Sequence, residues 1–188
     1  LWAEQRPENW WDAARSAIAG VLKETGVSGR DVRGVGLSGQ MHGLVLLDDS
    51  GSVLRRSLIW CDQRSQPQVD AINQTVGKDE VLRCIANPVL TGFTLPKLLW
   101  VRDNDPSSFD RARKMLLPKD YVRLRLTGEH AMDKADGSGT LLFDLAARTW
   151  STEVTDALEI PREWLPPTYE GPVVTGTVSR TAAADTGA

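Results

Sequence analysis

The sequence predicts an α/β domain, because strand-like and helix-like segments alternate along a chain of ordinary globular composition. Short apolar runs of strand length are followed by longer segments whose apolar residues recur at helical spacing. The chain has 188 residues, of which 41% are hydrophobic and 25% are charged. These values are typical of globular proteins, and the length suits one sizeable core. Strands that alternate with helices are typical of the α/β class.

The first predicted element is a helix over Pro7–Thr25. Pro7 suits the first turn, where its missing amide hydrogen needs no partner, and Gly26 is a suitable stop. Trp10 and Trp11 could form an aromatic platform for a ligand, but tryptophans on an amphipathic helix more often pack in the core.

Two predicted strands, Arg33–Leu37 and Leu44–Asp48, flank the polar stretch on which the interpretation of the chain depends. Gly39 and Gly43 lie at the ends of this stretch. Glycine lets the backbone bend sharply and lets a ligand approach the main chain closely. The sequence therefore predicts a tight loop between two strands.

Three side chains make this loop a candidate site. Gln40 and His42 supply hydrogen-bond donors and acceptors, and Met41 supplies an adaptable apolar surface. These groups would suit a small polyol, and functional groups favour loops on a rigid scaffold. The alternative is a hairpin with a buried histidine.

A second polar cluster follows the predicted strand Leu58–Trp60. Cys61–Arg64 comes directly after this apolar run, where a sheet would present side chains to a cleft. Trp60 and Asp62 are therefore further candidates for the site. The alternatives are simple core packing for Trp60 and a helix N-cap for Asp62.

Proline, glycine and polar breakers delimit the remaining predicted elements. The predicted helices cover residues 69–76, 77–85, 96–104, 106–113, 118–126 and 151–158. The predicted strands cover residues 53–54, 114–117 and 141–144, while 171–178 is a final strand or an extended linker and 180–188 resembles an interrupted helix. Lys97 could meet a phosphate, although a solvated or capping lysine is commoner.

Residues 133–140 suggest a metal or phosphate site, because Asp133 and Asp136 are followed by two glycines. The stretch fits neither kind of site. A calcium loop needs oxygen ligands at alternate positions and a later glutamate, and a phosphate-binding loop needs Gly-Lys-Ser/Thr. A polar bend before the next strand is the better prediction.

The overall charge and the cysteines argue against several classes of protein. The formal net charge is −3 and the basic residues are scattered, so nucleic acid is not expected as a partner. Cys61 and Cys84 have no zinc-binding spacing with each other or with the two histidines, which favours a reduced, cytoplasmic protein. No apolar run approaches the ~20 residues that a bilayer requires, and no signal peptide opens the chain. The chain opens on Leu1, and we expect it to be a fragment.

Several segments, in the same order and spacing, resemble one protein family. The family's first diagnostic pattern is matched at all of its constrained positions. These positions are Gly92, Thr94, Lys97, Leu98, Trp100, Val101, Asp103 and Asn104. Ser38–Gly43 is similar to the family's sugar loop, at which glycerol kinases instead carry Arg-Glu after the glutamine. By these motifs the chain resembles the FGGY family of carbohydrate kinases over essentially its whole length, and within it the bacterial members that phosphorylate D-xylulose.

The resemblance implies a ribonuclease-H-like domain of the actin-like ATPase superfamily, in which helices flank a mixed sheet. Two such domains close over a cleft that holds the sugar and ATP, and residues 1–188 would supply most of the first. Met41 and His42 match the pair that contacts the sugar, Trp60 matches a tryptophan that covers it, and Asp62 lies in the adjoining polar motif. An aromatic face and a thioether would cover carbon–hydrogen surface, while polar groups would hold hydroxyls.

The resemblance also implies that parts needed for catalysis lie outside this sequence. An Asp-Leu-Gly-Thr loop for the phosphates and Mg²⁺ should precede Leu1, and the general-base aspartate and the adenine-binding domain should follow Ala188. ATP and Mg²⁺ would be bound mainly by those parts, no catalytic residue is expected in this chain, and the chain alone should be inactive. Members of the family often form dimers, which leaves a homodimer as an open alternative.

Three alternatives to a D-xylulose kinase stay open. The sugar could be gluconate, ribulose or a fucose derivative. The chain could instead belong to a non-catalytic sugar-binding or regulatory module, or it could be a plain structural domain.

Overall fold

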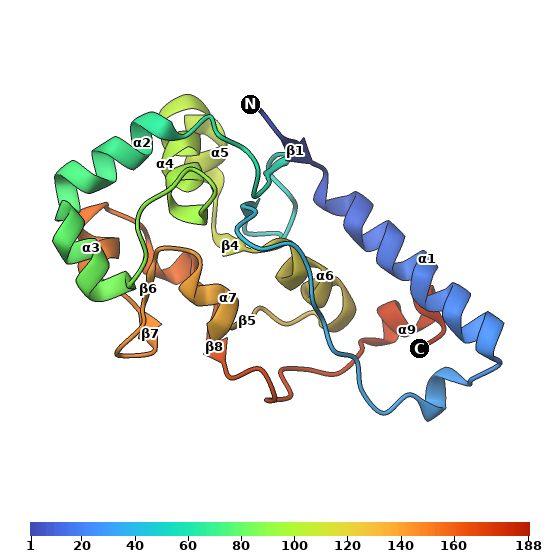
Figure 1. The fold of residues 1–188 in the computed structure, drawn as a ribbon. Coiled ribbons are helices and arrows are strands. Elements are labelled where there is room, and N and C mark those ends of the chain that lie inside the picture. Colours follow the sequence, from blue (N-terminus) through green and yellow to red (C-terminus); the bar gives the residue numbers. More distant parts are fainter.

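The computed structural model describes residues 1–188 and shows an elongated molecule built around a few short strands (Figure 1). Helices α1 (Pro7–Thr25) and α9 (Arg180–Thr186) lie together at one end, and α2 (Gln66–Ile72) and α3 (Lys78–Ile85) lie at the other. None of the helices combines the length and the apolar character that crossing a membrane would require.

Helices and strands alternate along the chain, as predicted. The remaining helices are α4 (Thr94–Asn104), α5 (Pro106–Arg111), α6 (Pro118–Thr127), α7 (Lys134–Ser138) and α8 (Thr152–Ala157). The strands are β1 (Glu4–Gln5), β2 (Val45–Leu47), β3 (Ser57–Leu58), β4 (Lys114–Leu116), β5 (Met132–Asp133), β6 (Phe143–Asp144), β7 (Thr149–Trp150) and β8 (Thr168–Tyr169). A π-helical turn over Asn73–Gly77 joins α2 to α3, and 3₁₀ turns cover Gly29–Asp31 and Arg162–Trp164.

The strand pairs are of both kinds, so the sheet structure is mixed. β1 with β3, β2 with β4, and β6 with β7 are antiparallel, whereas β5 with β8 is parallel. Two isolated antiparallel bridges, Leu44 to Leu58 and Leu47 to Val53, join the other edge of β2 to β3 and to the segment before it. β2 therefore has hydrogen-bonded neighbours on both edges.

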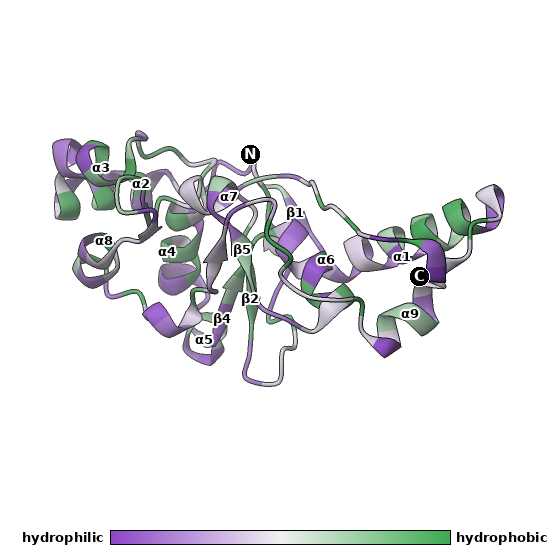
Figure 2. Ribbon diagram, turned by 90° about the horizontal axis from the view of Figure 1, so that it is seen from below, coloured by the Kyte–Doolittle hydropathy of each residue, from purple (hydrophilic) through white to green (hydrophobic).

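β2 and β4 separate two hydrophobic layers. Successive side chains of a strand point to opposite faces. Accordingly, Leu46 and Met115 belong to the larger core cluster with α4, while Val45, Leu47 and Leu116 belong to the smaller cluster with α1 and α6. Figure 2 shows the two strands side by side between α4 and α6. A strand that is buried on both faces is apolar along its whole length, as this one is.

Most predicted helix ends are confirmed, because the residues that set them act locally. α1 starts at Pro7 and ends at Gly26, which has φ 68°. α6 starts at Pro118 and ends at Gly128, which has φ 83°. A positive φ of this kind favours glycine and closes the helix.

The predicted strand at Arg33–Leu37 is wrong. This segment is extended but forms no bridge to any strand. The physical reason is that β4 occupies one edge of β2, and the bridges to Val53 and Leu58 occupy the other. The alternative of a hairpin across residues 33–48 is therefore wrong as well.

Three further predictions are corrected or resolved. The polar bend predicted at residues 133–140 contains the short helix α7, because the Asp133 carboxylate accepts a hydrogen bond of 2.9 Å from the amide of Asp136 and caps it. Residues 171–178 are the extended linker of the two alternatives, because they form no bridge. The predicted strand at Leu58–Trp60 is confined to Ser57–Leu58.

Replacing Leu46 with alanine tests the central position of β2. Leu46 is fully buried, so Leu46→Ala should lower the free energy of unfolding by about 2–5 kcal/mol, through lost burial and a residual cavity. Urea denaturation measures the change. The matched control is Leu82→Ala on α3, where the side chain is 49% exposed and the loss should be much smaller. Equal losses for the two variants would contradict this description of the core.

Candidate functional site

Four segments from distant parts of the sequence meet at the loop that precedes β2. This loop, residues 39–43, is bonded to residue 139 after α7. Lys97 of α4 joins it to the turn at residues 91–93, because its Nζ donates to carbonyl oxygens in both segments. The same turn lies against residue 60, because a Cβ added to Gly92 would be 3.1 Å from the carbonyl oxygen of Trp60. The structure therefore brings the two predicted polar clusters into one region.

His42 has a fixed backbone and a fixed ring. Its φ is 64°, in the left-handed region that non-glycine residues rarely adopt. Its Nδ1 lies 2.9 Å from the carbonyl oxygen of Gly139, and its ring meets the ring of Phe93 edge to face at 4.7 Å. A carbonyl oxygen only accepts, so Nδ1 must carry the hydrogen. In the neutral ring Nε2 is then a hydrogen-bond acceptor.

The environment of His42 favours the neutral ring. Burial lowers the pKa of His42 below its usual value of 6.5, and the positive charge of Lys97 lowers it further. The hydrogen bond to Gly139 and the charge of Asp136 oppose this shift without cancelling it. At neutral pH the imidazole is therefore uncharged, and Nε2 has a free lone pair.

Met41 and Trp60 supply exposed apolar surface in this region. Their side chains are 41% and 57% exposed, so both are open to a ligand. The neighbouring Gln40 donates a hydrogen bond of 2.8 Å to Gln5, and its amide is therefore directed toward β1. The alternative that Trp60 simply packs in the core is wrong.

Asp62 lies beneath the region rather than on its surface. Its side chain is fully buried and accepts hydrogen bonds from the amide of Ala3 at 2.6 Å and from the Arg64 guanidinium at 2.7 Å. Burial opposes ionisation, but hydrogen bonds from Arg64 and Ala3 outweigh it and hold the pKa of Asp62 below its usual value. The alternative that Asp62 caps a helix is wrong, because α2 begins at Gln66 after Ser65.

Lys97 is the residue whose position the sequence did not reveal. A solvated or capping lysine is the commoner expectation, but the side chain is fully buried. Its Nζ donates hydrogen bonds to the carbonyl oxygens of His42 at 3.0 Å, Phe93 at 3.2 Å and Gly92. Burial lowers the pKa of Lys97 to about 7, against the opposing charges of Asp62 and Cys61. One feature of the sequence could have indicated the burial of Lys97. It is the single charged residue within the apolar run Leu95–Leu99.

A cluster of charged side chains borders the loop on the side of α6. Lys119 Nζ lies 3.0 Å from Asp120, 2.5 Å from Asp133 and 2.9 Å from Asp136. A Cβ added to Gly39 would be 3.0 Å from Cβ of Lys119, so glycine lets the loop lie close to this cluster. Burial raises the pKa of Asp120 to about 6, although Lys119 opposes the shift.

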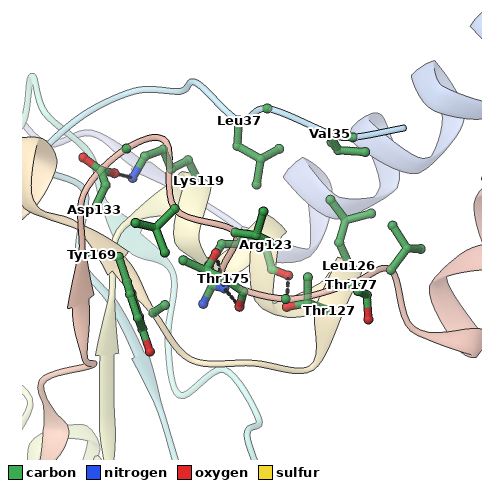
Figure 3. A pocket seen from close by; sticks show the side chains of 18 of the residues that line it. Val35, Leu37, Lys119, Arg123, Leu126, Thr127, Asp133, Tyr169, Thr175 and Thr177 are labelled. Carbon is green, nitrogen blue, oxygen red and sulfur yellow. Dashed lines mark hydrogen bonds and ion pairs between the residues drawn. The ribbon is translucent and has the colours of Figure 1, made fainter. Parts of the chain in front are cut away.

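A cavity lies beyond this cluster. It has a volume of about 560 Å³ and lies between residues 32–37, α6 and residues 169–178 (Figure 3). Its lining includes Val35, Leu37, Arg123, Leu126, Thr175 and Thr177. None of the predicted site residues Met41, His42, Trp60 and Asp62 lines it. We therefore base the candidate site on the loop and not on this cavity.

Comparisons with known proteins match the whole chain to one protein family. The model described as "FGGY family of carbohydrate kinases, N-terminal domain" matches residues 1–188. Xylulose kinase of Escherichia coli (strain K12) is 41% identical over 176 residues, which cover 94% of this chain and 36% of that protein. The chain thus spans little more than a third of the curated relatives that it matches.

Two solved structures share the fold. The xylulose kinase from Rhodospirillum rubrum is 32% identical with a TM-score of 0.92, over 100% of this chain and 38% of that one. The gluconate kinase from Lactobacillus acidophilus is 26% identical with a TM-score of 0.91, over 99% of this chain and 37% of that one. These likenesses confirm the ribonuclease-H-like, actin-like ATPase fold that the motifs implied.

The ionisation of His42 can be measured directly. Its pKa in the folded chain should lie below 6.5, the value expected for a free histidine. A group whose folded pKa is depressed binds protons more readily when unfolded, so its contribution to stability is lost as the pH falls below about 6.5. Nitrogen and carbon NMR of labelled histidine measures the midpoint and should show hydrogen on Nδ1. A peptide of residues 38–46 is the reference, and a midpoint in the protein at or above that of the peptide would contradict the description.

The buried pair of Asp62 and Arg64 should matter for folding. Asp62→Ala leaves the Arg64 guanidinium without its main buried partner, so the free energy of unfolding should fall by roughly 3–5 kcal/mol. Asp12→Ala removes the exposed partner of Arg15 and should change stability by less than about 1 kcal/mol. Urea denaturation of both variants measures the difference. Similar small effects would show that Asp62 does not organise the region beneath Trp60.

Proposed function

The chain belongs to the FGGY family of carbohydrate kinases, and from this premise we propose that it is part of the first domain of a D-xylulose kinase. The reaction would transfer the terminal phosphate of ATP to D-xylulose and give D-xylulose 5-phosphate. The curated relatives at about 40% identity carry the name xylulose kinase. The observation that carries the proposal is the fixed, neutral imidazole of His42, with a free acceptor beside exposed apolar surface.

The proposed sugar site is the loop at residues 39–43 with the turn at Trp60. Nε2 of His42 accepts a hydrogen bond from a sugar hydroxyl, and Met41 and Trp60 cover carbon–hydrogen surface. Asp62 supports this site from below, since its oxygens already accept from Ala3 and Arg64. In this proposal Asp62 therefore keeps the turn in place and does not itself reach the sugar.

The family implies ATP and a divalent metal, but the residues of this chain do not fit a Mg²⁺ site. The three carboxylates of Asp120, Asp133 and Asp136 surround the Lys119 ammonium, which occupies the place a cation would take. The other acidic cluster consists of Glu80, Glu153 and the thiol of Cys84. A thiol is a poor ligand for Mg²⁺, and the Arg83 guanidinium already pairs with both carboxylates. We therefore assign ATP and Mg²⁺ to other parts of the protein and derive no step through them.

This assignment makes the isolated chain inactive. Phosphoryl transfer depends on positioning both substrates and on neutralising charge around the transferred group. In this proposal the chain positions the sugar only, and the general base lies elsewhere in the protein. A cytoplasmic location and a homodimer remain predictions, the former in keeping with the free thiols of Cys61 and Cys84.

A kinase for a different sugar is the second candidate, because the fold also serves a gluconate kinase. Gluconate carries a carboxylate, which needs a cation or several donors at the site. Neither lysine at the loop is free to bind it. Lys97 is buried and its hydrogens are already donated to three carbonyls, and Lys119 is paired with the carboxylates of Asp120, Asp133 and Asp136. This observation favours a neutral ketose over a sugar acid.

A substrate panel on the complete protein tests the proposal. D-xylulose should give the highest kcat/KM among D-xylulose, D-ribulose, L-fuculose, gluconate and glycerol, measured by ADP release. His42→Ala should lower kcat/KM for D-xylulose on the order of tenfold, because a hydroxyl loses its acceptor. His130→Gln, a change outside the loop, is the control and should keep the activity of the unmodified protein.

Two results would contradict the proposal. One is a preference for another sugar, and the other is equal activity of the His42→Ala and unmodified proteins. ATP-dependent turnover by residues 1–188 alone would show that the assignment of ATP and Mg²⁺ to other parts is wrong.

A further inference from the structure

The ammonium of Lys97 lies where the loop that carries His42 meets the turn before α4. An ammonium group has three hydrogens to donate. The three acceptors are the carbonyl oxygens of His42 at 3.0 Å, Phe93 at 3.2 Å and Gly92. Asp62, the carboxylate whose charge acts on Lys97, is itself paired with Arg64, and Lys97 forms no ion pair. The side chain of Lys97 is fully buried. All three hydrogens of Lys97 are therefore donated to backbone carbonyls, and they join the loop at residues 39–43 to the turn at residues 91–93.

Burying an ammonium group without an ion pair is energetically unfavourable. Removing a charge from water costs several kcal/mol even after the protein relaxes. The neighbours of Lys97 on α4, Leu95, Leu98 and Leu99, show that an apolar side chain would suit the helix. The position of Lys97 is thus explained by its three carbonyl partners and not by the packing of α4.

The carbonyl oxygen of His42 is held twice. It accepts from Lys97 and also from the Thr94 hydroxyl at 3.3 Å. These two bonds restrain a residue whose φ of 64° is unfavourable for a side chain other than glycine. The backbone of His42 and the start of α4 are therefore fixed to each other.

The same contacts decide which way the imidazole presents its lone pair. With the backbone fixed, Nδ1 of His42 donates to Gly139, and a Cβ added to Gly139 would lie 2.7 Å from Cε1 of the ring. The charged groups that act on the ring are Lys97, which disfavours the imidazolium, and Asp136, which favours it. The hydrogen bond to Gly139 and the edge-to-face contact with Phe93 hold the ring in the observed orientation, in which Nε2 is its acceptor.

We propose that Lys97 is a positioning residue for sugar recognition, which fastens the His42 loop to the start of α4 so that Nε2 of His42 is presented to the sugar. This inference rests on the proposed function, and it adds a buried residue that touches neither substrate. Lys97 acts on the sugar only through His42, so its loss should affect sugar binding far more than the binding of ATP.

Steady-state kinetics of Lys97→Met in the complete protein test the inference. Methionine keeps the length and the apolar stem but donates no hydrogen bond. The KM for D-xylulose should rise at least about tenfold, while kcat and the KM for ATP stay within about twofold. Lys78→Met, at an exposed position on α3, is the matched control and should change none of these values. An unchanged KM for D-xylulose, or equal increases in both KM values, would overturn the inference.

A second variant tests the same inference if Lys97→Met fails to fold. Thr94→Val removes the other donor to the carbonyl oxygen of His42 and nearly conserves volume. It should raise the KM for D-xylulose severalfold, again without a change in the KM for ATP. In a folded Thr94→Val protein, an unchanged KM for D-xylulose would overturn the inference.

Hydrogen exchange separates a failure of this inference from a failure of the proposed function. In Lys97→Met, or in Thr94→Val where the former does not fold, exchange over residues 39–43 and 91–94 should be faster by at least about tenfold, while α1 keeps its protection. Unchanged protection of both segments would overturn the role of Lys97 whichever sugar the protein accepts. If the panel identifies another sugar, the kinetic comparison is made with that sugar.

Discussion

The burial of β2 on both faces and its pairing on both edges constrain the rest of the structure. Leu46 packs toward α4, and Val45 and Leu47 pack toward α1 and α6. A one-residue slip would exchange the two faces, so the register of this strand is strongly specified. The loop that enters β2 is fixed in the same way, because Gly43 lies so close to Pro118 that an added Cβ would be 2.5 Å from its ring.

From that fixed strand the candidate site is built in two levels. The upper level consists of His42 and the exposed side chains of Met41 and Trp60. The lower level is polar but buried, with Lys97 holding backbone carbonyls and Asp62 held by Arg64. Buried charges of this kind add little to stability but can specify one arrangement of the chain. We infer that the upper side chains owe their geometry to the lower ones.

The sequence allowed the α/β class and many helix ends to be predicted, because Pro7, Gly26 and Gly128 act on their own turns. From its composition the sequence also predicts the loop with Met41 and His42 as the candidate site. Features that depend on contacts between distant parts of the sequence could not be predicted. The segment at residues 33–37 does not pair with β2, whose two edges are taken by β4 and by the bridges to Val53 and Leu58. The burial of Lys97 depends on a loop more than fifty positions away. Local patterns do not contain such pairings.

The account depends on the sugar lying at the loop before β2, and a crystal structure of the complete protein with D-xylulose tests this directly. The account predicts a sugar hydroxyl at about 2.7–3.0 Å from Nε2 of His42, with Met41 and Trp60 against carbon–hydrogen surface. D-xylulose bound instead in the cavity between α6 and residues 169–178, with His42 free of contacts, would contradict it.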